Sequence, residues 1–214
     1  RQYREPRGRL TVDCVNGAGT EVPCRVSVTG PDGRSYAPDD ALRHADDAFD
    51  RAERRLEYGY FHSPGSATLS VPAGPVTVEV TRGLEYRVET RAVNVAAGAE
   101  AKVQVPLVLL DDLEARGWVS GDLHVHMNYG GAYRMTPERL RLQAEAEDLR
   151  VVWNLIVNKE QRIPDIAYFN QGRPDAVSTA RTIEGRFGRG SISHIIDFMA
   201  NACTRSCMIE EPSP

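Results

Sequence analysis

The sequence lacks any long run of apolar residues. Its 214 residues are 41% hydrophobic and 26% charged, and no stretch approaches the roughly 20 apolar residues that a membrane-spanning helix needs. It also lacks a surplus of positive charge, because 26 basic residues face 30 acidic ones. We therefore expect no membrane span and no nucleic-acid partner, since binding to phosphates depends on a basic surface.

Cysteine is scarce as well. The four cysteines are too few for a disulfide scaffold and do not have the spacing of a zinc ribbon. Cys14 and Cys24 occupy matching phases of two adjacent predicted strands. We interpret them as buried thiols, with a disulfide as the alternative in an oxidising compartment. No signal-peptide pattern follows Arg1, so exported, periplasmic and cytoplasmic locations all stay open.

Residues 9–110 alternate apolar and polar side chains with the period of two that is typical of half-buried strands. Leu10, Val12 and Cys14 show the pattern first, and turn residues such as those at 30–33 separate one alternating run from the next. Short alternating strands between turns are typical of an antiparallel sandwich. We therefore predict that residues 9–110 form an all-β domain, an antiparallel β-sandwich.

A charged segment over residues 38–58 interrupts this pattern. It mixes aspartate and arginine with alanine and lacks the glycine and the alternating oxygen ligands of a calcium loop. We interpret it as an exposed insert that is partly helical. His44 and His62 flank the insert and are predicted to be surface or turn histidines.

The pattern changes after Gly117 to a strand, a helix and a second strand. Residues 118–126 are predicted to form the first strand, and Thr136 and Pro137 are the residue types that begin a helix. Residues 151–157 are a nearly continuous apolar run, which is typical of a buried strand. This α/β segment is the βαβ unit from which parallel sheets and barrels are built.

The first of these strands carries an Asp-x-His-x-His motif. On a regular strand Asp122, His124 and His126 share one face, while Leu123 and Val125 point into packing on the other. Two imidazoles at this spacing can reach one metal ion, and a carboxylate can orient an imidazole through its other nitrogen. We therefore predict His124 and His126 as metal ligands and Asp122 as a catalytic residue. The alternative is a half-exposed surface strand without a metal.

Residues 117–129, followed by residues 136–138, resemble the opening of metal-dependent hydrolases of the PHP (polymerase and histidinol phosphatase) superfamily. Within that superfamily the segment looks most similar to the carbaryl-hydrolase-like (CehA/McbA) branch. The resemblance implies a distorted barrel with a zinc or manganese centre, in which His124 and His126 are the first two ligands. It also implies hydrolysis of an ester, amide, carbamate or phosphoester in a small-molecule substrate. In such proteins a sandwich similar to carboxypeptidase regulatory or transthyretin-like domains can precede the barrel.

The sequence departs from this family after the first βαβ unit. Superfamily members usually carry a Thr-Asp-His-Asn motif at the end of the second strand, and only Asn158 agrees with it here. A (β/α)₈ barrel takes about 250 residues, and residues 117–175 supply only its start. Residues 176–214 are predicted to form an irregular tail with room for one short helix. We therefore expect the chain to be a fragment, or to lose its reading frame near residue 175.

Two function classes follow from these patterns. The first is a metal-dependent hydrolase with weak or no activity in this chain, because catalytic zinc normally has three protein ligands and the motif supplies two. The second is a non-catalytic β-sandwich that serves as a binding or accessory module. Fingerprints of serine nucleophiles, phosphate loops and dinucleotide sites are absent from the sequence.

Overall fold

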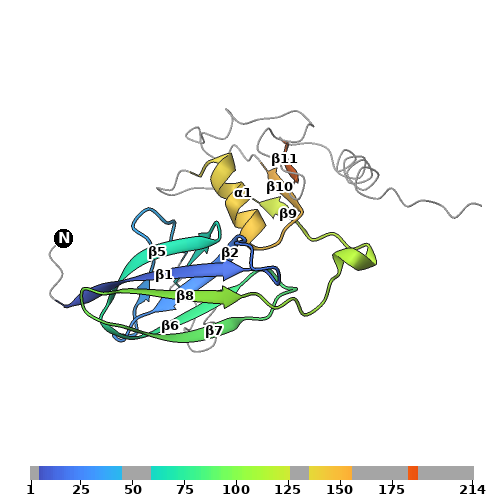
Figure 1. Ribbon diagram of the computed structural model, residues 1–214. Helices are drawn as coiled ribbons and strands as arrows, with labels where there is room; N and C mark the ends of the chain where they lie inside the picture. Colours follow the sequence, from blue (N-terminus) through green and yellow to red (C-terminus); the bar gives the residue numbers. More distant parts are fainter. Residues whose placement is uncertain (1–4, 45–58, 126–134, 156–182, 188–214) are drawn as a thin grey trace, which may run out of the picture. The chain divides into compact units, whose positions relative to one another are not determined.

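The computed structural model describes residues 5–44, 59–125, 135–155 and 183–187. The chain divides into two compact units, which are Arg1–Ser120 with Glu138–Arg150, and Gly121–Pro137 with Val151–Pro214. The first unit holds a β-sandwich and a helix, and the second holds a parallel sheet (Figure 1). The helix therefore groups with the sandwich, although in sequence it lies between two strands of the parallel sheet.

Two sheets make up the sandwich. The first has the order β5–β1–β8 and consists of Arg7–Val15 (β1), Ser66–Pro72 (β5) and Glu100–Pro106 (β8). The second has the order β3–β2–β6–β7, with β4 paired to β2. Its strands are Cys24–Thr29 (β2), Ser35–Tyr36 (β3), Tyr60–Ser63 (β4), Gly74–Thr81 (β6) and Glu89–Val95 (β7). The strand pairs of the two sheets are antiparallel, except that β1 runs parallel to β8.

The core lies between these two sheets and contains the alternate apolar residues of their strands. Leu10 and Val12 of β1 and Val78 and Val80 of β6 are at most 1% exposed. Successive side chains of a strand point to opposite faces, so each strand gives one face to this core. The predicted β-sandwich is therefore confirmed, while the parallel pair β1–β8 departs from the antiparallel arrangement that the sequence predicts.

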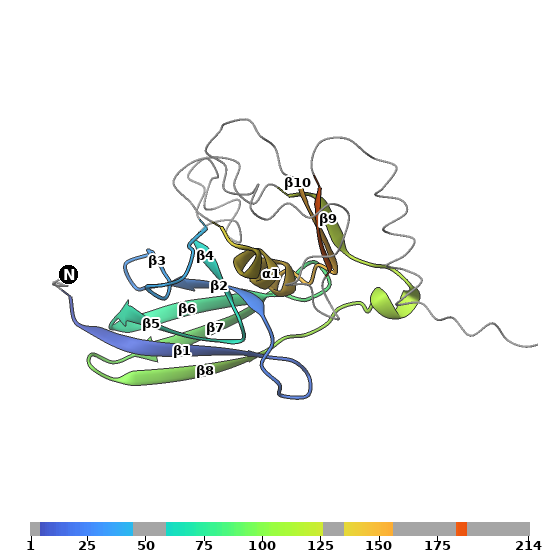
Figure 2. The ribbon, with the colours of Figure 1, turned by 90° about the horizontal axis from the view of Figure 1, so that it is seen from above.

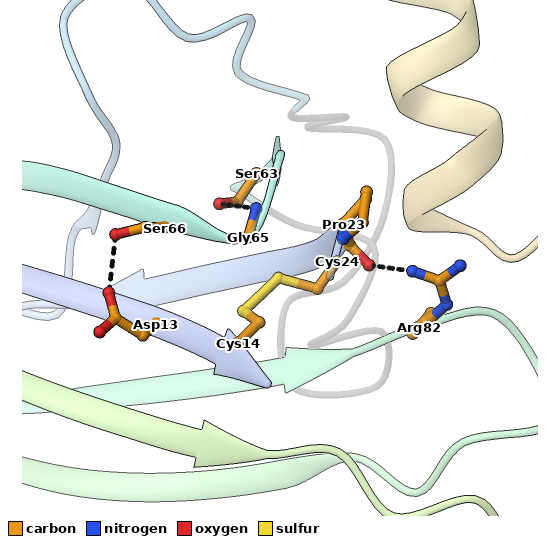
Figure 3. The surroundings of a disulfide bond; sticks show 8 residues. All are labelled: Asp13, Cys14, Pro23, Cys24, Ser63, Gly65, Ser66 and Arg82. Carbon is orange, nitrogen blue, oxygen red and sulfur yellow. Dashed lines mark hydrogen bonds between the residues drawn. A yellow bond between two sulfur atoms is a disulfide. The ribbon is translucent and has the colours of Figure 1, made fainter. Parts of the chain in front are cut away.

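A disulfide links the two sheets inside this core. It joins Cys14, near the end of β1, to Cys24, at the start of β2, with 6.6 Å between their Cα atoms (Figure 3). Both cysteines are fully buried, and the backbone N–H of Val22 donates to the carbonyl oxygen of Cys14. The favoured interpretation as thiols is therefore wrong. Both cysteine side chains point into the core from opposite sheets, and there they are close enough to form the bridge.

A single α-helix follows the sandwich within the described residues. Helix α1 spans Pro137–Ala146 and begins where Thr136 and Pro137 predict. Its buried side chains include Leu140, Ala144 and Ala146. The chain turns sharply at Asp148, whose φ of 52° lies in the left-handed region. Figure 2 shows α1 beside β2 and β4, the strands that its C-terminal end contacts.

The second unit contains a parallel sheet with the order β11–β10–β9. Its strands are Gly121–Val125 (β9), Val151–Leu155 (β10) and Ile183–Phe187 (β11). Val152 and Trp153 are 1% exposed, as expected for a strand of a parallel sheet. The third strand lies inside residues 176–214, which the sequence predicts to be irregular. Its pairing depends on β10, more than 25 residues earlier, and so leaves no local signal.

The boundaries of the first parallel strand also differ from the prediction. Strand β9 begins at Gly121 instead of residue 118, and a short 3₁₀ turn spans Glu114–Arg116 (η2). Trp118 and Val119 are 70% and 54% exposed, so neither packs into a sheet. Within the described residues, no helix is long and apolar enough to cross a membrane.

Candidate functional site

The predicted metal motif begins on β9. Asp122 and His124 are both exposed on this strand, and Val125 is half-buried. His126, the second predicted ligand, lies outside the described residues. The structure therefore places one of the two predicted imidazoles, at the carboxyl end of a parallel strand.

Strand β9 is not regular across the motif. Asp122 is opposite Val152 and Val125 is opposite Asn154, so three steps along β9 match two steps along β10. An extra residue of this kind breaks the simple alternation of side chains. Leu123 is accordingly 40% exposed, and the prediction that it points into packing is wrong.

The carboxylate of Asp122 bonds to the local main chain. Its Oδ1 accepts a 2.9 Å hydrogen bond from the backbone N–H of His124. Such a bond from an aspartate to the amide two residues on stabilises an irregular backbone, which agrees with the register shift. A role for Asp122 in orienting an imidazole ring stays a prediction.

The described donors do not complete a metal centre. In this part of the chain no group of three or more histidine, cysteine, aspartate or glutamate side chains is placed to hold an ion. Catalytic zinc normally takes three protein ligands. His124, with or without Asp122, therefore needs partners from other residues before it can hold a metal in this way.

A second group of polar side chains lies on the sandwich, and the sequence does not predict it. The rings of His44, Tyr60 and His62 form a compact cluster, with centroids 4.9 to 5.5 Å apart. The guanidinium of Arg25 lies over the Tyr60 ring at 4.3 Å. The His62 side chain is only 7% exposed. Neither histidine is therefore an isolated surface residue, and for His62 the prediction of a surface histidine is wrong.

Glu147, just after α1, ties this cluster to the helix. Its Oε1 lies 2.8 Å from Nε2 of His62 and accepts a 2.7 Å hydrogen bond from Nε of Arg25. Burial raises the pKa of the Glu147 carboxyl, but the hydrogen bonds with His62 and Arg25 outweigh burial and hold that pKa below its ordinary value. The carboxylate is therefore ionised at neutral pH and forms an ion pair with Arg25.

His44 has the strongest electrostatic perturbation of the group. Burial, together with the nearby positive charges of His62 and Arg25, lowers its pKa from 6.5 to about 4. Its Nε2 lies 3.1 Å from Nε2 of Gln143, on α1. His44 is therefore neutral at physiological pH and accepts this amide hydrogen bond. The one local sequence signal for the cluster is that Tyr60 and His62 are two residues apart on β4 and so share one face of the strand. The contact with Glu147 has no local signal, because His62 and Glu147 are 85 residues apart.

Comparisons with known proteins give no family assignment. No family model matches the sequence, and no curated protein matches it. Among solved structures, the TIE protein of Bacillus anthracis is 16% identical with a TM-score of 0.32, over 48% of this chain and 16% of that one. The minor pilin GBS52 of Streptococcus agalactiae is 12% identical with a TM-score of 0.36, over 50% of this chain and 47% of that one.

A pilus-presented adhesin, Spy0125 (Cpa), is 13% identical with a TM-score of 0.27, over 48% of this chain and 27% of that one. This chain thus spans less than half the length of each of these three proteins. Similarity at this level assigns neither a family nor a function.

Proposed function

We propose that the segment containing β9, α1 and β10 belongs to a metal-dependent hydrolase of the PHP-superfamily type. In this proposal His124 and His126 ligate zinc or manganese, and Asp122 supports them. The observation that carries it is the parallel pairing of β9 with β10 around an Asp-x-His-x-His motif. Parallel α/β folds use the carboxyl ends of their strands for catalytic sites.

A bound metal would lower the pKa of a water molecule towards about 7 and polarise an ester, amide, carbamate or phosphoester bond. The contribution of this chain is the imidazoles of His124 and His126, with ligands still to be supplied by other residues. We therefore expect weak or no turnover from the 214-residue chain.

Metal content tests this proposal directly. The purified chain is loaded with Zn²⁺ or Mn²⁺, dialysed and analysed by mass spectrometry beside the His124→Ala/His126→Ala double variant. A His194→Ala variant serves as the matched control, because it removes a histidine outside the motif. Near-stoichiometric metal that only the double variant loses supports the proposal. Trace metal that neither variant changes contradicts it.

Hydrolysis of p-nitrophenyl esters and phosphates is the second measurement. Efficient metal-dependent turnover that is lost in His124→Ala contradicts the expectation of weak activity, while it supports the assignment of the site. Turnover that persists in the double variant contradicts the assignment itself.

A second proposal is a non-catalytic binding or accessory role for the sandwich. It is supported by the closed core of the sandwich, which the Cys14–Cys24 disulfide crosses, whereas the described parallel sheet lacks a complete ligand set. Under this proposal the chain holds no metal tightly, and changing His124 and His126 leaves the stability of the sandwich unchanged. The metal measurement therefore separates the two proposals.

A further inference from the structure

The C-terminal end of α1 is attached to the sandwich by polar contacts between residues that are distant in sequence. Glu147 bonds to Arg25 of β2 and His62 of β4, and Gln143 contacts His44. A separate ion pair joins Asp148 to Arg82, which follows β6, with 2.9 Å between Oδ1 and Nη2. These contacts come from β2, β4, the turn after β6 and the segment at His44, so four segments of the sandwich hold one helix end.

The backbone packs closely at the same place. A Cβ atom at Gly83 would overlap the carbonyl oxygen of Glu147, and the φ of Gly83 is +57°. Only glycine adopts this conformation at little cost. The turn after β6 therefore touches the helix end directly, beside the Arg82–Asp148 ion pair.

We propose that these contacts form an acid-sensitive clasp, which holds the end of α1 on the sandwich at neutral pH and releases it when His44 and Glu147 take up protons. The clasp consists of Arg25, His44, His62, Gln143 and Glu147. It goes beyond the proposed hydrolase function and does not depend on a metal.

The charges around His44 set the direction of the effect. Within the described part of the chain, the groups that face it are Arg25 from β2, Tyr60 and His62 from β4, and Gln143 and Glu147 from the helix end. A proton on His44 would place a further positive charge near Arg25 and close to His62. It would also remove the lone pair that accepts the hydrogen bond from Gln143. Among the residues that the structure describes, only Glu147 would attract the new charge, and Arg25 and His62 already bind that carboxylate.

The sign of the linkage follows from the pKa values. The pKa of His44 is about 4 in the clasp and 6.5 when the ring is released into solvent. The released state therefore binds a proton first, and the clasp weakens as the pH falls from about 6.5 towards 4. Glu147 acts in the same direction at lower pH, because its pKa in the clasp lies below its ordinary value of 4.5.

The connection from α1 to β10 has contacts of its own beside the clasp. Asp148 is three residues before Val151, where β10 begins, and Ser120 Oγ donates a hydrogen bond to the carbonyl oxygen of Asp148. Opening the clasp would therefore release Gln143 and Glu147, while Asp148 keeps its contacts with Arg82 and Ser120 and the core of the sandwich stays closed.

Hydrogen exchange of the complete 214-residue chain tests the clasp. Amides of α1 are compared at pH 7.5 and pH 5.0, after correction for intrinsic exchange, with amides of β1 and β8 as the internal reference. We expect the protection of α1 to fall about tenfold more than that of the reference strands, after allowing for the partial exposure of His44. Equal changes in α1 and the strands would overturn the proposal.

A variant without the titrating ring provides the matched test. In His44→Gln the amide side chain keeps a hydrogen-bonding partner for Gln143 but takes up no proton, so α1 should lose most of its sensitivity between pH 7.5 and 5.0. His124→Gln removes a histidine outside the clasp and should leave that sensitivity unchanged. Full acid sensitivity in His44→Gln would overturn the proposal.

Two further measurements decide the case in which His44→Gln destabilises the helix at both pH values. Nuclear magnetic resonance of the unmodified chain should show the His44 ring titrating below pH 5, and titration near 6.5 would overturn the proposal. Gly83→Ala should loosen α1 at pH 7.5 and leave β1 protected, because it separates the helix end from the turn after β6. An unchanged α1 in this variant would also count against the clasp.

Discussion

The sandwich and the parallel sheet show how far a local sequence pattern determines packing. In the sandwich, alternate residues of β1 and β6 are buried as their pattern predicts. On β9 the same kind of alternation is interrupted by a register shift, and Leu123 is 40% exposed. The difference teaches that alternation is decisive where two sheets close on one core. It is less reliable on a strand whose packing depends on distant segments.

Shortening a side chain in the sandwich core should have the largest effect. Leu10 is fully buried, so Leu10→Ala should lower the free energy of unfolding by about 2–5 kcal/mol through lost burial and an unfilled cavity. Leu84→Ala is the matched control, because Leu84 is fully exposed. Urea denaturation measures both variants. Equal losses in the two would show that the sandwich core does not dominate stability.

Removing the disulfide should have the next largest effect. The bridge closes a loop between residues ten positions apart, and replacing both cysteines by alanine should cost about 3 kcal/mol on a chain-entropy estimate. Urea denaturation with and without dithiothreitol measures this in the unmodified chain. The Cys203→Ala/Cys207→Ala variant should respond to reduction as the unmodified chain does. No difference between oxidised and reduced protein would contradict the bridge.

A smaller effect is expected at Asp13, where the sandwich buries a carboxylate. The Asp13 side chain is 4% exposed, lies 2.6 Å from Nζ of Lys102 and accepts a 2.6 Å hydrogen bond from Ser66 (Figure 3 shows the latter). Burial raises the pKa of Asp13, but the hydrogen bonds from Lys102 and Ser66 prevail and lower it. Asp13→Asn should therefore cost about 1 kcal/mol at pH 7.

The pH dependence of this contribution has a definite sign. Because the folded pKa of Asp13 lies below 3.8, the stabilisation is present above pH 3.8 and disappears as the pH falls through the folded value. The difference in stability between the unmodified chain and Asp13→Asn should therefore shrink below pH 4. A difference that grows on acidification would contradict this assignment.

The smallest effect should come from the exposed leucine of β9. Leu123→Ala should change the free energy of unfolding by less than about 0.5 kcal/mol, because Leu123 retains much of its exposure in the fold. Val152→Ala is the comparison. Val152 on β10 is only 1% exposed, so this variant should lose more free energy of unfolding. Thermal denaturation followed by circular dichroism measures both. A large loss of stability in Leu123→Ala would contradict this exposed position and support the regular strand that the sequence predicts.

Much of the fold is predictable from short-range signals. The alternation of Leu10 and Val12 predicts a sandwich strand, Thr136 and Pro137 mark the beginning of α1, and the apolar run at Val151 predicts β10. Each of these signals depends on residues only a few positions apart. For this reason it holds whichever strand or helix the segment later packs against.

Other features depend on partners that no local pattern identifies. The register shift on β9 appears only in its pairing with β10, and β11 becomes a strand through the same neighbour. Glu147 contacts His62, which lies 85 residues earlier in the sequence. For the candidate metal site, the sequence predicts His124 on a strand. It does not predict that Asp122 bonds to the backbone of His124, because that bond requires the irregular strand.

The parallel pairing of β1 with β8 has a mechanical consequence. The chain enters β1 at Arg7 and leaves β8 at Pro106, and the aligned pairs run from Arg9 with Glu100 to Val15 with Pro106. Tension applied where the chain enters and leaves would slide the two strands lengthwise past each other. Their evenly spaced hydrogen bonds would then share the load and break together, whereas peeling would break them one after another. The sandwich is therefore built to resist stretching along its own chain.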